Sequence, residues 1–587
     1  MTYPKRLIEV DLPIRRISEH ARRDQNIRKG HLHTMHVWWA TRPLASCRAV
    51  IMATLLPDPV DPNCPQHFRQ EARQLMQNWA KHHMNRASAE SLSRLVRIQR
   101  DPSRLDDPNE LRAVLLDFIA DFAAWEAGVD EAYLKTARAL VAAAHPDGPP
   151  LVLDPFAGAG SIPCEALRVG AQAFAGDLNP VAVLIDKVAL EYLPKYGRRL
   201  AESVEKWGKW VLEEARKRLA PYYPADSEGN IPLAYIWART ITCEGPGCGA
   251  EVPLLGMLWL SRKSKNLVAL RYRGIKPEGG GQKAEGESGR ITTSDFCLMT
   301  SDLSSRKAEV QVEIFSPRSE REVQPPIVKR FAATCPCCGY TTPYEKVREQ
   351  LRKKRGGTNE ARMVAVITLD RKGGRHFRLP NDADREAAAK AARDLAEIEQ
   401  RQYGGLSFVP HEPTPPDGTL GYRINKYGME KWSDVYLPRQ ALALGTFCGL
   451  VGEVREQIVK EKHDPAYADA IASGTALAIG NMTHFFSGVS GWIMDHMISC
   501  FHNNGVPMRA TFADSNPTMP RYVGGYEYAL ELVTSFLERE AAASTVMGTV
   551  QAASATDIPL PDDSVGYVVT DPPYYDAVPY AALSDFC

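Results

Sequence analysis

Residues 147–190 carry the pattern that most constrains how this chain of 587 residues can fold. An apolar run at 150–154 is followed by a glycine-rich turn, a helical pattern at 161–170 and a second apolar run at 171–177. Two strands joined by a helix in this way lie parallel in one sheet, with a right-handed crossover between them. The sequence therefore predicts an α/β fold for this part of the chain.

The glycine-rich turn has the sequence DPFAGAGS and covers residues 154–161. Glycines at the start of a helix let the backbone approach a bound ligand closely. Asp177 stands at the end of the second predicted strand, where an acidic residue typically binds the ribose hydroxyls of a nucleoside cofactor. Taken alone, the turn is also compatible with any nucleotide site, or with tight packing of a helix on a strand.

A second motif, Asp571-Pro572-Pro573-Tyr574, directly follows an apolar run at 565–570 that predicts a buried strand. One interpretation is a rigid Pro-Pro turn. The other is a site that methylates an amine. An exocyclic base amine is a poor nucleophile, and two acceptors for its hydrogens, the Asp571 carboxylate and the Pro572 carbonyl, would free its lone pair. The prolines stiffen the loop, and Tyr574 would stack on a base flipped out of the duplex.

The order and spacing of these motifs predict inserted domains. The glycine turn comes first, and the next recognisable strand of the same sheet is at 547–554. A compact domain does not carry so long a stretch as a loop. The glycine turn, Asp177 and the later Asp-Pro-Pro-Tyr motif are three independent features that indicate the same kind of site, so together they are stronger evidence than any one alone.

Cysteines make up 12 residues of the chain, and some of them fall in two tight clusters. Cys243 and Cys248 form the first cluster, and Cys335 and Cys338 form the second, with Cys337 between the last two. Two short-spaced pairs beside glycine and proline are typical of a four-thiolate structural zinc ribbon. Reduced cysteines without metal are the alternative. Cys337 is either a spare thiol or a substitute ligand.

The composition excludes several classes of protein. With 71 Lys+Arg against 71 Asp+Glu, the chain is not uniformly basic as a DNA-coating protein would be, although a local basic patch remains possible. Neither a secretory signal nor an apolar window long enough to span a membrane is found. We therefore expect a cytoplasmic protein without a membrane partner, in which paired cysteines bind metal before they form disulfides.

A basic and aromatic stretch near the N-terminus has two interpretations. Its tryptophans, Trp38 and Trp39, either pack beneath a helix at the surface, or lie near a cofactor or DNA. In the second case Arg28, Lys29 and Arg42 contact phosphates.

Three histidines in the same stretch, His31, His33 and His36, could suggest a metal site. We do not expect one, because no acidic partner lies close by in the sequence.

Taken together, the motifs DPFAGAGS, AGDLNP and VVTDPPYYD resemble those of S-adenosylmethionine-dependent amino methyltransferases that act on DNA adenine. The resemblance is closer to the zinc-ribbon-containing adenine-specific DNA methylases associated with DISARM-type anti-phage systems. It is carried there by HLHTMHVWWATRPLASCRAV, YIWARTITC, YGMEKWSDVYLPRQ and DPPYYDAVPYAALSDF, and it extends over most of the chain.

This resemblance implies a Rossmann-like S-adenosylmethionine methyltransferase core with helical and zinc-ribbon insertions. Asp177 would hold the cofactor's ribose, and Asp557 would stand near its adenine in place of the family's usual acidic residue. Asp571, Pro572, Pro573 and Tyr574 would be the catalytic residues. The methionine part of the cofactor would lie among Asp154, Pro155, Phe156, Gly158 and Gly160.

The implied function is methyl transfer to the N6 amine of adenine in double-stranded DNA, in a bacterial restriction-modification or anti-phage system that has other subunits as partners. Cytosine N4 methylation is one alternative, because the amine chemistry is the same. A non-catalytic, zinc-dependent nucleic-acid-binding subunit is the other. The chain stops soon after Tyr574, so we expect it to be truncated before its sheet is complete.

Six segments follow from these patterns. Within the fifth, we expect the alanine-rich helix at 381–402 to be a solvent-exposed spacer. The segments are a basic and aromatic N-terminal segment (1–60), a helical region (61–146), the first part of the core with the cofactor loop (147–225), the zinc-ribbon insertion (226–345), a charged helical and proline-rich connector (346–436), and helices with the second part of the core (437–587).

Overall fold

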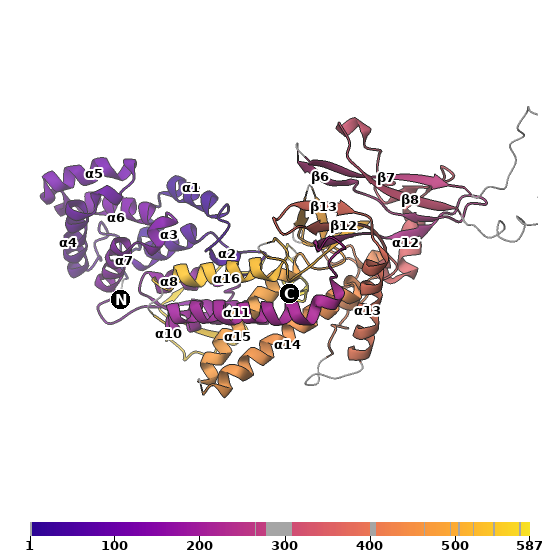
Figure 1. The fold of residues 1–587 in the computed structure, drawn as a ribbon. Coiled ribbons are helices and arrows are strands. Elements are labelled where there is room, and N and C mark those ends of the chain that lie inside the picture. Colours follow the sequence, from indigo (N-terminus) through magenta and orange to yellow (C-terminus); the bar gives the residue numbers. More distant parts are fainter. Residues whose placement is uncertain are drawn as a thin grey trace, which may run out of the picture.

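The computed structural model has a mixed α/β fold with helices and several sheets (Figure 1). None of its described helices is both long and apolar enough to cross a membrane. The residues it describes are 3–263, 266–276, 308–399, 407–462, 464–493, 495–502, 505–520, 522–543, 546–574 and 577–586.

Helices alone form the N-terminal part of the molecule, at the indigo and purple end of Figure 1. Asp107 and Asp130 cap the last two helices by accepting hydrogen bonds from backbone N–H groups of the first turn. The helices are α1 (Ile14–Asp24), α2 (Leu32–Met35), α3 (Leu44–Leu55), α4 (Gln66–His82), α5 (Ala89–Arg100), α6 (Pro108–Phe122) and α7 (Glu131–Ala144). Because the helices α4 to α7 cover most of residues 61–146, the helical region predicted there is confirmed.

A four-stranded parallel sheet follows, and its strand order is β17-β2-β1-β18. The helix α8 (Ser161–Arg168) joins β1 to β2, which confirms the predicted strand–helix–strand unit. Because all four strands run in the same direction, the segments that follow them meet at one edge of the sheet. The strands are β1 (Leu151–Asp154), β2 (Gln172–Asp177), β17 (Thr549–Ala552) and β18 (Tyr567–Val568).

The prediction that 565–570 forms a buried strand is wrong. The strand β18 contains two residues, and the side chain of Val568 is 62% exposed. Within the described residues β18 pairs with β1 on one side only, so it is an edge strand of the sheet. Apolar composition alone does not distinguish such an edge strand from a central one.

A second sheet is antiparallel, with the order β13-β12-β3-β16. Its two strands β12 and β13 lie within the segment 346–436, which the sequence predicted as a charged helical and proline-rich connector. The apolar run at 362–369, which forms β12, was not recognised as a strand because charged residues lie on both sides of it. The strands are β3 (Ile231–Ala238), β12 (Arg362–Leu369), β13 (Arg375–Arg378) and β16 (Thr511–Ser515).

Long helices pack on one another next to the N-terminal part and run toward the second sheet (Figure 1). They are α11 (Arg198–Leu219), α14 (Pro438–Lys460), α15 (Pro465–Thr483) and α16 (Tyr526–Glu540). A further helix, α13 (Asp382–Glu399), packs against α14 and buries Ala387, Ala391 and Leu395. The expectation of a solvent-exposed spacer is therefore wrong for α13, because its alanine face is narrow enough to approach α14 closely.

Two further sheets lie around the cysteines, in the part of the molecule where Figure 1 labels β6, β7 and β8. The order of the larger one is β4-β5-β8-β7-β6, and that of the smaller one is β11-β10-β9. Their strands are β4 (Thr240–Thr242), β5 (Glu251–Pro253), β6 (Trp259–Lys263), β7 (Asn266–Ile275), β8 (Glu309–Phe315), β9 (Val328–Lys329), β10 (Ala332–Thr334) and β11 (Thr341–Thr342). A two-stranded hairpin, β14 (Gly491–Ile493) and β15 (His496–Ile498), lies beside β6.

A buried ionic network fastens the N-terminal helices to the parallel sheet unit. Arg48 of α3 and Arg168 of α8 both donate from Nε to Glu165 Oε2, at 2.7 and 2.9 Å. Arg168 Nη2 also donates to Glu540 Oε2 at 2.6 Å, which brings in α16. All four side chains are at most 2% exposed. Burial alone would raise the pKa of Glu165, but the two guanidinium groups outweigh it and lower the pKa below its ordinary value.

Candidate functional site

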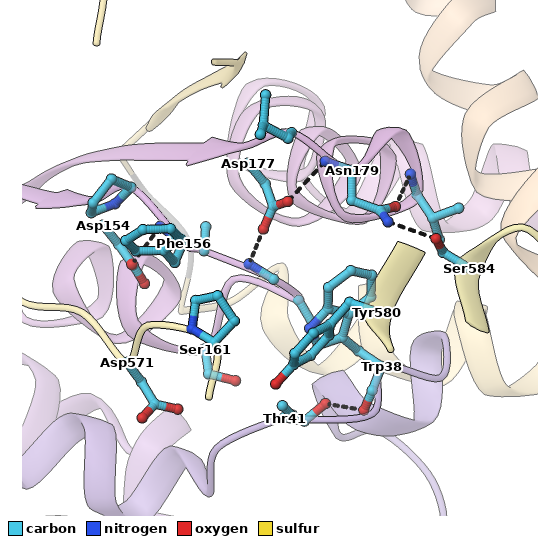
Figure 2. A pocket seen from close by; sticks show the side chains of 18 of the residues that line it. Trp38, Thr41, Asp154, Phe156, Ser161, Asp177, Asn179, Asp571, Tyr580 and Ser584 are labelled. Carbon is cyan, nitrogen blue, oxygen red and sulfur yellow. Dashed lines mark hydrogen bonds between the residues drawn. The ribbon is translucent and has the colours of Figure 1, made fainter. Parts of the chain in front are cut away.

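A cavity of about 530 Å³ lies at the carboxyl edge of the parallel sheet (Figure 2). Its volume falls within the range of small-molecule sites, about 300–1,000 Å³. Four parts of the chain line it: the turn after β1, the residues after β2, the loops after β17 and β18 with the helix α17 (Tyr580–Ser584), and Trp38–Arg42 of the N-terminal part. The cavity thus gathers segments from both ends of the chain.

The turn after β1 depends on its two glycines. Gly158 and Gly160 have φ values of 59° and 76°, in the left-handed region that favours glycine. A Cβ atom on Gly158 would lie 2.5 Å from Trp38 Nε1, and one on Gly160 would collide with the Asp186 carboxylate. Larger residues cannot occupy either position without displacing these neighbours.

Asp177 joins the end of β2 to the glycine turn. Its Oδ2 accepts a hydrogen bond from Gly158 N at 2.9 Å, and its Oδ1 accepts one from Asn179 N at 2.8 Å. The Asn179 side chain in turn donates to Ser584 Oγ of α17 at 2.6 Å. Figure 2 shows this chain of contacts along one wall of the cavity. The predicted ribose-binding acid therefore lines the cavity in a fixed position.

Asp154 links the glycine turn to the loop after β18. Its buried Oδ1 accepts hydrogen bonds from Phe156 N at 3.1 Å and from Thr570 Oγ1 at 2.7 Å. Burial raises the pKa of Asp154 to about 6, against the opposing effect of these two hydrogen bonds. Thr570 directly precedes Asp571, so Asp154 fixes the point at which the Asp-Pro-Pro-Tyr segment begins.

Asp571 lines the cavity and is already paired. Arg42 Nε donates to Asp571 Oδ2, and Arg42 Nη2 donates to the Tyr574 hydroxyl at 3.2 Å. The same guanidinium lies over the Tyr574 ring, 5.6 Å from its centroid. Pro573 also lines the cavity, whereas the Tyr574 side chain is 60% exposed outside it. The sequence predicted that Arg42 contacts a phosphate. In this structure its guanidinium contacts a carboxylate instead.

The remaining N-terminal residues singled out by the sequence separate into two groups. Trp38 lines the cavity and stacks on Tyr580 of α17, with ring centroids 6.0 Å apart, and Trp39 packs against Phe501. Arg28 and Lys29 are exposed and do not line the cavity, and Lys29 pairs with Glu531. Tyr580 and Ser584 lie in the motif DPPYYDAVPYAALSDF, but sequence reasoning did not single them out as cavity residues.

Asp557, the predicted neighbour of the cofactor's adenine, does not line the cavity. It is exposed, and its backbone N–H donates to Ser554 O at 2.9 Å within a tight turn. Ala553 and Ala555 of the same loop line the cavity instead. An apolar wall therefore stands where the sequence predicted an acid.

An acid that sequence reasoning did not place there, Asp24 of α1, lies beside the histidine stretch. His31 Nε2 lies 4.0 Å from Asp24 Oδ2, because α1 packs beside this segment. Burial lowers the pKa of His31 to about 2 and that of His36 to about 4, so both rings are neutral. Among the described residues, the one group of three or more metal-binding side chains that converge is made of cysteines instead.

That group consists of Cys243, Cys248, Cys335 and Cys338, whose Sγ atoms all lie within 4.8 Å of one another. The Sγ atoms of Cys243 and Cys338 are 3.5 Å apart, and those of Cys248 and Cys335 are 3.8 Å apart. Four thiolates at about 2.3 Å from one zinc ion stand about 3.8 Å from each other. The four cysteines could therefore bind a metal ion such as zinc.

Cys337 lies outside this group. It is buried, and its Sγ donates to the backbone carbonyl of Glu309 in β8 at 3.3 Å. Cys337 therefore packs against the neighbouring sheet and is a spare thiol, not a fifth member of the cluster.

Residues 11–82 match a family model described as a protein of unknown function (DUF1156). The matched segment runs from α1 to the end of α4, and it supplies Trp38 and Arg42 to the cavity. Neither a curated protein nor a solved structure matches this chain.

Proposed function

We propose that this chain is an S-adenosylmethionine-dependent DNA methyltransferase that modifies the N6 amine of adenine and is built on a Rossmann-like core. One observation carries the proposal. A single cavity gathers the glycine turn, Asp177 and Asp571, which are widely separated in the sequence but all follow parallel strands. Ligands of open parallel sheets bind at this edge.

The cavity suits a nucleoside cofactor with a charged amino-acid part. The glycine at 158 lets Trp38 approach the turn closely, and the Asp177 carboxylate lines the same cavity beside it. The Ser161 hydroxyl is buried and lacks a hydrogen-bond partner among the described residues, so it is available to a ligand. When bound, S-adenosylmethionine supplies an electrophilic methyl group on a sulfonium.

Asp571 and the Pro572 carbonyl would accept the two hydrogens of the adenine amine, so that the nitrogen lone pair is free to attack. Arg42 holds Asp571 Oδ2, so an amine that uses this oxygen would have to displace the guanidinium. The exposed ring of Tyr574 offers a stacking surface for a base turned out of double-stranded DNA. The proton leaves to solvent after transfer, and no covalent intermediate with the protein forms.

The test compares Asp571→Ala with Asp557→Ala, which removes a carboxylate that lies outside the cavity. Each protein is incubated with S-adenosylmethionine and plasmid DNA, and the modified nucleosides are identified by mass spectrometry. We expect N6-methyladenine from the wild type and Asp557→Ala, and none from Asp571→Ala. N4-methylcytosine would identify the other amine as the target. Methylation by Asp571→Ala would overturn the proposal.

We also propose that the metal of the cysteine cluster is zinc and that its role is structural. Four thiolates complete a tetrahedral coordination shell and leave no position for a substrate. The cluster joins the loop after β4 to the turn after β10, so the ion would hold the five-stranded and the three-stranded sheet together. Measuring the metal content of the purified protein tests this proposal.

A further inference from the structure

A second cavity, of about 520 Å³, lies between the hairpin β9–β10 and the hairpin β14–β15. Arginines and aromatic rings stand within its largely apolar lining. They are Arg262, Arg330, Arg509, Trp259, Phe331 and Trp492. It shares no lining residue with the cavity at the parallel sheet.

Two of these residues occupy a backbone conformation that does not suit them. Lys329 and Ala332 pair across the hairpin, so Arg330 and Phe331 form its two-residue loop. Their φ values are 50° and 62°. A loop with positive φ at both positions favours Asn-Gly, and larger residues cost free energy there. Strained residues of this kind cluster at ligand sites, which makes the side chains of Arg330 and Phe331 candidates for contact with a ligand.

The arginines leave positive charge at the cavity. Arg330 is exposed, and no carboxylate among the described residues pairs with it. Arg509 donates to the backbone carbonyls of Val489 at 2.7 Å and Ser499 at 3.2 Å, and these contacts hold the guanidinium without neutralising it. Arg262 lies over the Trp259 ring, 5.3 Å from its centroid, and pairs with Glu320 at the surface. The cavity therefore suits an anionic ligand with a flat ring.

Packing connects this cavity to the first one. Ile498 lines it at the end of β15, and Phe501, a little further along the chain, packs against Trp39 with ring centroids 5.4 Å apart. Trp38, the neighbour of Trp39, lines the cavity at the parallel sheet. On its other side, β10 runs directly into Cys335 of the metal cluster. The two cavities and the metal cluster are therefore linked through directly packed residues.

We propose that the second cavity binds an unpaired nucleobase of DNA together with its adjacent phosphate. The base would stack on Phe331 or Trp259, and Arg330 would contact the phosphate, as in sites that hold single-stranded nucleic acid. This inference rests on the proposed function, because it assigns a second contact to the same DNA substrate. An anionic peptide is the competing ligand, and the test separates the two.

The test uses the double variant Arg330→Asn/Phe331→Gly, which installs the preferred loop sequence while it removes both side chains. The variant relieves the strained loop but also removes the packing of the Phe331 ring on Tyr427, whose centroids are 5.1 Å apart, so a thermal melt first establishes that it is folded. Arg371→Asn, in the turn between β12 and β13, is the matched control for loss of one exposed arginine. Binding is followed by fluorescence anisotropy of a labelled single-stranded oligonucleotide, an abasic oligonucleotide of equal length and an acidic peptide.

We expect the double variant to bind the single strand about tenfold more weakly than the wild type, the effect of roughly one stacked base. The control should bind like the wild type, and the abasic probe should bind more weakly than the intact strand. Equal binding of the single strand by variant and wild type would overturn the inference, as would equal binding of both oligonucleotides or preference for the peptide. Calorimetry with S-adenosylmethionine on the same proteins reports on the proposed function separately.

Discussion

Arg42 and Asp571 form an ion pair although they stand 529 positions apart in the chain. Arg42 belongs to the N-terminal segment that matches the family model, and Asp571 follows the last described strand of the parallel sheet. The pair lies at the cavity and is partly exposed, at 36% for Arg42 and 30% for Asp571. The pair occupies Oδ2 of the carboxylate that the proposed reaction needs, so the substrate amine and Arg42 compete for that oxygen.

Replacing Arg42 should affect DNA binding more than the chemical step. Once an amine takes the Asp571 oxygens, the guanidinium loses its partner and lies beside the nucleotide's phosphates. We therefore expect Arg42→Ala to raise KM for DNA about tenfold with a smaller change in kcat, and to lower the salt dependence of binding by about one ion. Arg42→Lys should restore part of the loss. A fall in kcat at unchanged KM would instead mean that Arg42 acts on the chemistry through Asp571.

The glycine turn should not tolerate a methyl group. Gly158→Ala and Gly160→Ala each add a Cβ in a left-handed conformation against a buried neighbour, Trp38 Nε1 or the Asp186 carboxylate. We expect each to weaken S-adenosylmethionine binding at least tenfold in calorimetry. Gly449→Ala is the control, because an added Cβ there meets nothing within 4 Å and alanine favours the helix α14. Cofactor binding by Gly158→Ala at wild-type strength would contradict the role of the turn.

The sequence predicts the parts of the site that depend on local pattern, and misses those that depend on partners. The turn at 154–161 and Asp177 could be found because glycine spacing and strand ends are local signals. The stacking of Trp38 on Tyr580 could not, because it joins distant segments whose approach only the packed fold determines. The exposure of β18 was missed for the same reason, since the strands beside it decide whether an apolar strand is covered.

Removing the metal should disturb the sheets around the cysteines and spare the cofactor cavity. The cysteines belong to a different buried core from the one behind the parallel sheet. We expect Cys248→Ser to lose the metal in elemental analysis and to lower Tm, while calorimetry still detects S-adenosylmethionine binding. Cys337→Ser should retain one metal ion per chain, because its thiol contacts Glu309 O rather than the cluster. Metal loss in Cys337→Ser would place that thiol among the ligands.

Removing one member of the ionic network at Glu165 should lower the free energy of unfolding strongly. Glu165→Gln leaves Arg48 and Arg168 buried with an incomplete set of charges, and breaking such a pair costs about 3–5 kcal/mol. Glu531→Gln is the control, because it breaks an exposed ion pair with Lys29 that is worth at most about 1 kcal/mol. Urea denaturation of both variants measures the difference. Equal losses would show that the network is not a principal attachment between α3 and α8.

Asp186 should make the stability of the fold depend on pH. Its carboxyl is buried beside Gly160, lacks a hydrogen-bond partner among the described residues, and has its pKa raised well above the ordinary value by burial and by Asp177 and Asp154. As pH rises past about 4, the unfolded chain loses this proton while the fold keeps it, so the free energy of unfolding falls by up to about 1.4 kcal/mol per pH unit. Asp186→Asn carries no charge at any pH and should lack this part of the slope. Urea denaturation of both proteins between pH 5 and 8 tests this, and parallel profiles would mean that Asp186 is ionised in the folded protein.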